Sequence, residues 1–385
     1  MQIAPFLLSF IVLWVASLLL HLHMSVLGRM AKRQQQPLRK EGLPPVSIVV
    51  TTHNQASELQ GNLPLLLEQA YPQDYEVVVV DCHSDDETTD LLEAMEEHYP
   101  HLHHTFCPAT ACDISLERLA LTLGFKSACH EWVCIMSADA QVPDNEWLTV
   151  LMQPIAGAAE QDVDAILGFT RYDHTRGWTG CRWTFFKLWQ QMLWQPFAQH
   201  HAPYRADDVN LCYRKSLFMR HQGFASHANL MSGAVTLLVN HNIRSGRCRV
   251  NVRKEAIVCL PQPSDRMWSQ KRLFYMETRR HMHHTFLYRL WYFVNVACNI
   301  LFPLLSIGLI TYFMPNYFTV IPLALMWMLA VAVKVLSYGF TARQMGVPTC
   351  HLLLPWLMLL IPLWDTEAWL RRCFTRKQTF RKRFL

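Results

Sequence analysis

Long apolar runs lie towards both ends of the chain, and shorter ones recur in its middle part. The long runs cover residues 3–27, 290–314 and 318–340 and hold almost no charged side chains. At about 1.5 Å of helix per residue, each is long enough to cross the hydrocarbon core of a membrane. The sequence therefore predicts three membrane-spanning helices around a more polar domain. Lys334, near the end of the third run, is expected to extend its ammonium group to the membrane surface.

A fourth apolar run, residues 347–364, is shorter and contains Pro355 and Pro362. If it crossed the membrane, the basic tail at 371–383 would lie on the side opposite to the other basic segments. Because positive charge gathers on the cytoplasmic side, we expect an interfacial or re-entrant segment and a cytoplasmic tail. The expected divisions are an anchor at 1–28, a basic linker at 29–45, a soluble domain at 46–285, two membrane helices at 286–340, and the interfacial segment with its tail at 341–385.

The basic residues after the first run set the expected orientation. No positive side chain precedes the run, whereas Arg29, Lys32, Arg33, Arg39 and Lys40 follow it. The positive-inside rule then puts the amino terminus outside and the soluble domain in the cytoplasm. The net charge is +5, but the basic residues lie beside apolar segments and form no single stripe. This pattern favours an anionic membrane surface over nucleic acid as a partner.

The middle part alternates short apolar runs with helical patterns. The runs at 46–52, 76–80 and 132–136 show no polar alternation, which is typical of parallel strands buried on both faces. Apolar residues at helical spacing separate them. The sequence therefore predicts a doubly wound α/β domain. The expected helices cover 57–69, 87–98 and 115–129, and further strands are expected at 165–169 and 256–260.

Two helices carry residues that are open to more than one interpretation. Residues 183–197 predict an amphipathic helix whose aromatic stripe favours core or interfacial packing over a platform for sugar rings. On the helix at 115–129, we expect Arg118 and Lys126 to be surface charges, with phosphate contact as the alternative. The aromatic stripe consists of Trp183, Phe186, Trp189 and Trp194.

Polar side chains gather where the predicted strands end. Asp81 and Asp86 follow the second strand, and Ser137 and Asp139 follow the one at 132–136. In open α/β sheets, ligands bind at the carboxyl ends of the strands, so a nucleotide or a phosphorylated small molecule is expected here. A carboxylate in this place accepts hydrogen bonds from a base N–H or a ribose hydroxyl. Asp86 suits a helix start equally well.

These features together resemble the inverting glycosyltransferases of family 2, which have the GT-A fold, and in particular their membrane-anchored bacterial members. The resemblance covers roughly residues 44–288, and the segment at 46–54 is similar to the first strand of the family. It implies a Rossmann-like domain that binds a nucleotide sugar, of the UDP type. Asn54 at the end of this segment is then an expected donor-binding residue.

The turn after the second strand carries part of the resemblance. Asp81 with Ser84, Asp86 and Thr88 is similar to the Asp-x-x-Ser-x-Asp-x-Thr turn of the family. The resemblance implies that Asp81 contacts the uracil or ribose of the donor. Ser84 and Asp86 are expected to bind the donor as well.

Ser137-Ala138-Asp139 stands where the family carries an Asp-x-Asp metal motif. That motif implies a divalent cation, magnesium or manganese, held against the donor diphosphate. Ser137 replaces the first carboxylate, which leaves Asp139 as the expected metal ligand. Magnesium often uses one or two carboxylates together with phosphate oxygens, so the replacement weakens the expected site without excluding it.

The expected general base is also missing. After Gly233, where the family has acidic residues, this chain has Ala234, Val235 and Thr236. None of these side chains takes up a proton near neutral pH. Asp207 and Asp208 are the candidate substitutes, although two adjacent carboxylates in a loop are more often simply solvated.

A third motif lies just before the membrane helices. Trp268-Ser-Gln-Lys-Arg272 resembles a family helix that contains Gln, Lys and Arg. Gln270, Lys271 and Arg272 are expected to contact the donor, with the two cations on the pyrophosphate leaving group. A juxtamembrane helix that meets lipid phosphates explains the same residues equally well.

The resemblance implies a membrane-bound enzyme at the cytoplasmic face of a bacterial inner membrane. Such an enzyme transfers a sugar from a UDP-sugar to a lipid-linked or cell-envelope polysaccharide acceptor, with inversion. The two replaced acidic motifs leave another interpretation open. In that interpretation the chain is a catalytically impaired binding or scaffold protein that acts beside an active glycosyltransferase.

Overall fold

A seven-stranded sheet with the order β3-β2-β1-β4-β7-β5-β8 forms the centre of the soluble domain. The computed structural model describes residues 4–108, 115–156, 162–173, 177–348 and 353–380. Strand β7 is antiparallel to both of its neighbours, and every other pair in the sheet is parallel. The strands are β1 (Val46–Thr52), β2 (Tyr75–Asp81), β3 (Leu102–Phe106), β4 (Trp132–Ser137), β5 (Ala165–Gly168), β7 (Leu211–Arg214) and β8 (Cys248–Asn251).

Helices cover both faces of the sheet, as the unbroken apolar strands predict. On β1, Ile48 and Val50 are buried in the core formed with α3 (Ala56–Leu67), α4 (Thr88–Glu96) and α6 (Trp147–Leu151), whereas Val49 faces the other core. That second core contains α5 (Leu116–Ser127), α7 (Trp178–His200) and α9 (Ala234–Asn242). The strands and helices of the doubly wound half therefore lie within a few residues of their predicted positions.

The strands that the apolar pattern did not predict lie away from the β1–β2–β4 centre. They are β3 at one edge, β7 and β8 on the other side of β4, and β6 (Thr170–Tyr172). Strand β6 pairs in parallel with β9 (Val258–Leu260) to form a separate two-stranded sheet. Each is only three to five residues long, too short to show a clear pattern of its own.

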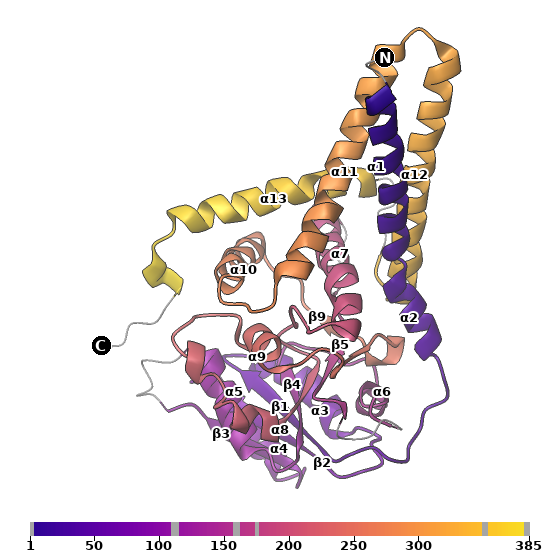
Figure 1. Cartoon of the computed structure of the whole chain (residues 1–385). Helices are drawn as coiled ribbons and strands as arrows, with labels where there is room; N and C mark the ends of the chain where they lie inside the picture. Colours follow the sequence, from indigo (N-terminus) through magenta and orange to yellow (C-terminus); the bar gives the residue numbers. More distant parts are fainter. Residues whose placement is uncertain (1–3, 109–114, 157–161, 174–176, 349–352, 381–385) are drawn as a thin grey trace.

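Long helices rise from the soluble domain as a bundle (Figure 1). Within the part of the chain that the structure describes, three stretches of helix are long and apolar enough to cross a membrane: Phe6–Gln34, Phe286–Phe313 and Tyr317–Gln344. The first consists of α1 (Ala4–His23) and α2 (Val26–Gln34), and the others are α11 and α12. The predicted linker at 29–45 is therefore helical as far as Gln34.

The bundle interior contains polar side chains. The expectation that Lys334 reaches the membrane surface is wrong: its side chain on α12 is buried among the helices. His21 of α1 lies 3.4 Å from the Asn299 Oδ1 of α11, and the Thr341 hydroxyl of α12 donates to the Met24 carbonyl at 2.8 Å. Polar groups inside a membrane bundle bond across helices because lipid offers them no partner.

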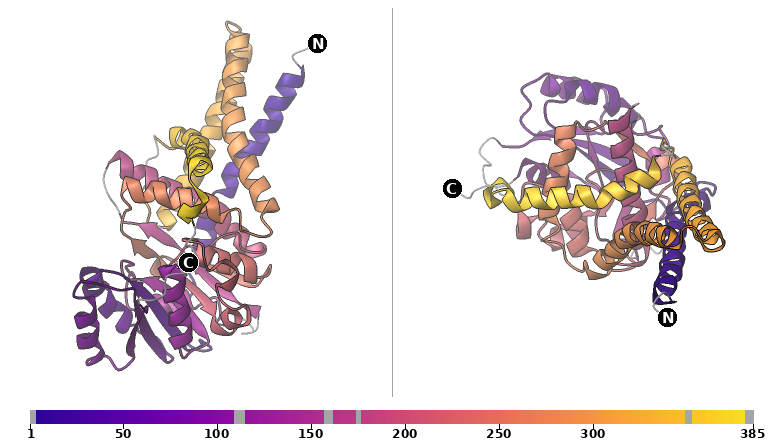
Figure 2. Two further views of the ribbon diagram at one scale, coloured as in Figure 1. Left: turned by 90° about the vertical axis from the view of Figure 1, so that its left-hand side faces the viewer. Right: turned by 90° about the horizontal axis from the view of Figure 1, so that it is seen from above.

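The fourth apolar run forms part of α13 (Leu354–Phe374), which continues ten residues beyond the predicted end at Trp364. Helix α13 runs crosswise to the bundle, along the side of the domain that faces it (Figures 1 and 2). It packs on α10 (Asp265–Thr278), where Arg372 Nε donates to Glu277 at 2.8 Å. The basic tail also returns to the domain, since Phe380 is buried against Phe274 of α10.

The close packing of α5 on β1 predicts a sensitive glycine. A Cβ atom added at Gly124 would lie 2.3 Å from the Val49 Cγ1 atom, whereas one added at Gly61 of α3 meets nothing within 4 Å. We expect Gly124→Ala to lower the free energy of unfolding by about 1 to 3 kcal/mol, the usual cost of overpacking. Gly61→Ala should raise it by about 0.5 to 1 kcal/mol through helix propensity. Thermal unfolding of the full chain in detergent tests this, and equal shifts for the two variants would contradict it.

Candidate functional site

A large cavity of about 840 Å³ opens at the carboxyl ends of β1 and β4. The parallel register sets its position, because Thr51 at the end of β1 pairs with Ser137 of β4, and Thr52 pairs with Asp81 of β2. The start of α5, the loop before β7, the start of α9 and one face of α10 complete the walls. The cavity therefore lies where ligands bind in open α/β sheets.

Three of the predicted donor-binding residues form one hydrogen-bonded unit beside this cavity. The Ser84 hydroxyl donates to Asp81 at 2.6 Å and accepts from the Asn54 backbone N–H at 2.9 Å. Asn54 in turn accepts from the Asp85 backbone N–H at 2.7 Å and has a left-handed φ of 53°. These bonds join the loops after β1 and β2, and His53, Gln55 and Cys82 of the same loops line the cavity.

Asp86 begins helix α4. Its carboxylate accepts from the Thr88 hydroxyl at 2.5 Å, from the Thr88 backbone N–H at 3.2 Å and from the Ala56 backbone N–H at 3.1 Å. The Thr88 hydroxyl bond, with the backbone bonds, lowers the pKa of Asp86. The structure thus gives this side chain the helix-start role, and it lies outside the cavity lining.

Ser137 and Asp139 both line the cavity, and the Ser137 hydroxyl donates to the Asp139 carboxylate at 2.5 Å. This pair offers one carboxylate and one hydroxyl oxygen. Such a set fits magnesium or manganese when phosphate oxygens and water supply the remaining ligands. It does not amount to a metal site formed by the protein alone.

The described residues contain one compact group of three metal-binding side chain types, formed by Glu76, Cys129 and His130. It lies at the starts of β2 and β4, at the opposite edge of the sheet from the cavity. Glu76 there accepts from the Ser47 hydroxyl at 2.5 Å and from the Cys129 backbone N–H at 2.6 Å. This group therefore joins strand starts and is not positioned to serve the cavity.

The adjacent candidates Asp207 and Asp208 lie in opposite environments. The Asp207 carboxylate accepts from Gln191 at 2.9 Å and from the Thr170 hydroxyl at 2.5 Å, and it pairs with Lys187 at 3.3 Å. Although burial opposes ionisation, Lys187 and the neighbouring Arg205 lower its pKa. Asp207 is thus a fully bonded anion that holds α7 to the cavity wall.

Asp208 points into the cavity with its carboxylate exposed. Loss of surrounding water in the cleft and the charge of Asp207 raise its pKa, while Lys271 opposes the change. Glu117, in the first turn of α5, lines the same cavity. Burial and the charge of Asp208 raise the pKa of Glu117 to about 8. When two carboxyl groups share a site in this way, one of them stays protonated while the other is ionised.

Arg118, the neighbour of Glu117, overturns the expectation of a surface charge. Its side chain is completely buried and donates to the Leu230 and Ser232 carbonyls, the latter at 2.8 Å. A further bond joins it to the Ser115 hydroxyl at 3.1 Å. The guanidinium thereby fixes the start of α5 to the loop that leads into α9. Lys126, by contrast, is exposed as expected.

The start of α9 carries no acid. Gly233 precedes it with a left-handed φ of 75°, and Ala234 and Val235 are buried. The Thr236 hydroxyl donates to the Ala206 carbonyl at 2.8 Å. Where the family resemblance implies a catalytic acid, the cavity wall therefore holds a hydroxyl with a structural partner.

The Gln-Lys-Arg motif divides between two places. Gln270 and Lys271 of α10 line the large cavity, as the donor-binding prediction requires. Arg272 is buried on another face of the helix and lies 3.4 Å from Glu367 of α13. The aromatic stripe of α7 is buried as well, which confirms the packing interpretation.

Glu117 is the functional candidate that sequence reasoning missed. It lies in a segment with ordinary helical spacing, and its partner Asp208 is 91 positions further along the chain, the difference between the two residue numbers. An acid in the first turn also has a simple local explanation, because it interacts favourably with the helix dipole. Only the fold shows that it faces another carboxylate.

The different bonding of the two adjacent aspartates predicts different stability effects. We expect Asp207→Asn to lower the free energy of unfolding by about 3 kcal/mol, since removing one partner of a buried ion pair costs this much or more. Its folded pKa is lower than its unfolded pKa, so this stabilisation is present above about pH 4 and is lost as the pH falls through the folded pKa. Asp208→Asn should leave stability at pH 7 unchanged or higher, because its ionisation is unfavourable in the fold. Chemical unfolding at pH 7 and pH 4 measures both, and an equal loss for the two variants would contradict the assignment.

Comparison with known proteins agrees with this geometry. The model for the family described as glycosyl transferase family 2 matches residues 47–218. A search of curated proteins found no match.

Among solved structures, the chain is similar to the mannosyltransferase PcManGT from Pyrobaculum calidifontis in complex with GDP-Man and Mn2+. The identity is 17%, the TM-score is 0.53, and the alignment covers 94% of this chain and 99% of that one. It is also similar to residues 1–349 of TarS from S. aureus, with 17% identity, a TM-score of 0.43, and 84% and 89% of the two chains covered. The mannosyltransferase shares the mixed α/β architecture of the GT-A fold. Residues 47–218 thus match the glycosyl transferase family 2 model, and the chain has a GT-A-like mixed α/β fold.

Proposed function

We propose that this protein transfers a sugar from a nucleotide donor, bound in the large cavity, to an acceptor at the membrane surface, with inversion at the anomeric carbon. The observation that carries the proposal is the convergence of Asp139, Asp208 and Lys271 on one cavity at the carboxyl ends of parallel strands. A carboxylate beside a hydroxyl, a free carboxylate and a cation are the groups that such a transfer needs.

The donor occupies the β1 and β4 side of the cavity in this proposal. Asp81, held by Ser84, lies at the end of β2 for the base or ribose, and Asn54 shapes the adjoining loop. Asp139 with Ser137 would hold a divalent cation, magnesium or manganese, which would neutralise charge on the diphosphate. Lys271 supplies a cation of the chain itself for the leaving group, and Gln270 lies beside it.

Asp208 is the general base in this proposal. It takes the proton from the acceptor hydroxyl as that oxygen attacks the anomeric carbon and the bond to the nucleotide diphosphate breaks. Its exposure to the cavity and its raised pKa suit this role, whereas Asp207 is held by three side chains. Asp207 keeps the loop in place.

The membrane bundle leads us to place the reaction at the cytoplasmic face of a bacterial inner membrane. The basic residues Arg29, Lys32 and Arg33 lie at the domain end of the first span, in α2, which is the side that the positive-inside rule assigns to the cytoplasm. The acceptor is then a lipid-linked or cell-envelope polysaccharide precursor that approaches from the membrane.

A second function has one observation in its favour. The start of α9 has no carboxylate, and Asp139 is the single acid of the metal motif. A protein that binds the nucleotide sugar without transferring it, and that supports an active glycosyltransferase partner, would keep the same cavity. The presence of Asp208 and Glu117 in that cavity favours transfer.

A donor assay separates these two functions. We expect the full chain in lipid to release the nucleotide from a UDP- or GDP-sugar in the presence of manganese or magnesium; the mannosyltransferase neighbour is in complex with GDP-Man and Mn2+. Asp208→Asn should lower kcat by about 10² to 10⁴, the usual contribution of a positioned general base, with little change in nucleotide affinity. Calorimetry with UDP and GDP provides the binding control. Binding by the unaltered chain without any turnover of the panel would support the scaffold instead.

Glu117 predicts an alkaline limit to the reaction. Because its pKa is raised to about 8, the carboxyl is neutral at pH 7 and becomes an anion as the pH rises. That second negative charge beside Asp208 opposes the diphosphate, so kcat/KM for the donor should fall above about pH 8. The Glu117→Gln side chain is neutral at every pH, so this variant should not show the fall in kcat/KM above about pH 8. It should still lose kcat/KM at low pH, where Asp208 becomes protonated. An unchanged alkaline limb in the variant would show that Glu117 is not the group responsible.

A further inference from the structure

A smaller pocket of about 80 Å³ lies between α7, α10 and α13, next to the large cavity. We call it the α13 pocket; it is lined by twelve residues, five of which also line the large cavity. A ligand group in it is therefore adjacent to the proposed reaction site. The five shared residues are Tyr172, Lys187, Arg205, Lys271 and Tyr275.

Arg272 is the main cation that belongs to the α13 pocket alone. It is 7% exposed, and its guanidinium lies over the Trp268 ring at 4.4 Å and the Phe186 ring at 5.7 Å. Its Nη1 atom is 3.4 Å from Glu367, but Nε and Nη2 have no hydrogen-bond partner among the described residues. Two buried donors on one cation are costly unless a ligand accepts from them.

Further donors in the pocket wall are also unpartnered. Arg205 donates to Gln190 at 3.0 Å and stacks on Tyr275 at 4.5 Å, while its Nε atom lacks a partner among the described residues. The indole N–H of Trp183, a residue 6% exposed, lacks one too. The pocket thus combines aromatic walls with several hydrogen-bond donors of positive or neutral charge.

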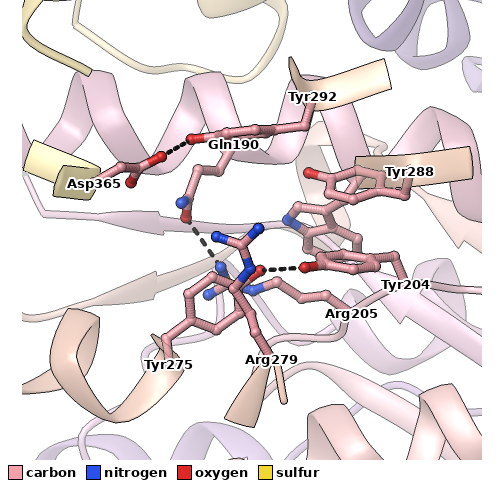
Figure 3. Close-up of a pocket in the computed structure, with 9 residues that line it drawn as sticks. Gln190, Tyr204, Arg205, Tyr275, Arg279, Tyr288, Tyr292 and Asp365 are labelled. Atoms are coloured by element: carbon pink, nitrogen blue, oxygen red, sulfur yellow. Dashed lines mark hydrogen bonds between the residues drawn. The ribbon is translucent and has the colours of Figure 1, made fainter. Parts of the chain in front are cut away.

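The pocket continues towards the membrane helices. Figure 3 shows the adjoining small pocket, in which Tyr288 and Tyr292 at the start of α11 lie above Arg205 and Arg279. Asp365 of α13 lines both small pockets and accepts from the Tyr292 hydroxyl. The chain of pockets therefore runs from the large cavity to the point where the first two turns of α11 meet α13.

The opposite face of α13 is apolar and exposed. Its large side chains follow helical spacing and face away from α10. An apolar face of this kind is typical of a helix that lies along a membrane surface with that face towards the lipid. A molecule in the α13 pocket is thus within reach of the bilayer on the other side of this one helix. The exposed residues on this face are Trp356, Leu363, Leu370 and Phe374.

We propose that the α13 pocket binds the phosphate group of a membrane lipid, whose hydrocarbon chain leaves between α11 and α13. Lys187 and Arg205 of the pocket wall also meet Asp207, and Arg272 meets Glu367. Arg272 Nε and Nη2 and Arg205 Nε nevertheless lack a hydrogen-bond partner among the described residues. Phosphate oxygens accept hydrogen bonds well from arginine N–H donors of this kind. That this lipid phosphate is also the group that receives the sugar rests on the proposed function.

The test uses the full chain in a neutral detergent and calorimetry with three probes: geranylgeranyl phosphate, geranylgeraniol and inorganic phosphate. We expect geranylgeranyl phosphate to bind at least tenfold more tightly than either of the others, because it alone offers both the anion and the chain. Arg272→Gln should weaken its binding about 10- to 100-fold, the effect of losing hydrogen bonds from a charged donor. The matched control is Arg266→Gln on the same helix, where the side chain is exposed; it should change nothing.

UDP and GDP binding to the large cavity checks that Arg272→Gln is folded. If nucleotide binding is lost in Arg272→Gln, the milder variant Trp183→Phe is used in its place. This substitution removes only the indole N–H and should weaken the binding of the lipid phosphate several-fold. Equal binding of inorganic and geranylgeranyl phosphate would identify a free-phosphate site and overturn the lipid assignment. Equal binding of the alcohol, or full affinity in both pocket variants, would overturn the phosphate assignment. Lipid phosphate binding without sugar turnover supports the pocket and counts against the proposed function alone.

Discussion

A single buried cation, Arg118, joins the two walls of the candidate site. Its guanidinium has no contact with solvent and is held by the carbonyls of Leu230 and Ser232 and by the Ser115 hydroxyl. Burying a charge is costly unless dipoles or an opposite charge replace the lost hydration. The Ser115 hydroxyl and the two carbonyls therefore cannot move apart without leaving the guanidinium exposed or without hydrogen-bond partners. The start of α5 and the loop before α9 therefore move together. As a result, Glu117 and Gly233 face one cavity although more than a hundred positions separate them.

The same residue shows where reasoning from the sequence ends. Apolar runs and their polar ends were sufficient to predict the β1–β2–β4 centre and a site at the carboxyl edge, because strand burial and parallel pairing leave a local pattern. A charge on an apolar helix has a surface position as its usual explanation, and the carbonyls that hold Arg118 have no side-chain signature. Glu117 was missed for a similar reason, since an acid in a first helical turn already has a local role. The antiparallel strand β7, four residues long, is likewise fixed by its neighbours and not by its own composition.

The pair Asp207 and Asp208 illustrates how environment separates two identical side chains. The two neighbours meet different surroundings: the Asp207 carboxylate meets Lys187 and Gln191, while Asp208 lines the open cavity. The first is a structural anion with a lowered pKa, and the second has a raised pKa. The start of α9 has no acidic residue. The loop before β7 instead supplies a carboxylate, that of Asp208, to the cavity that Lys271 also lines.

The contact between the first and last spans has a consequence for how the protein is made. The Thr341 hydroxyl of α12 bonds to the Met24 carbonyl at 2.8 Å, and Gly28 of α2 has no room for a side chain against Phe340. These partners lie more than 300 positions apart, so α1 is synthesised long before α12. His21 gains its partner earlier than Met24 does, because Asn299 lies on α11, which precedes α12 in the chain. Synthesis of the last span is therefore the step that completes the bundle, because Phe340 and Thr341 supply the contacts with Gly28 and Met24.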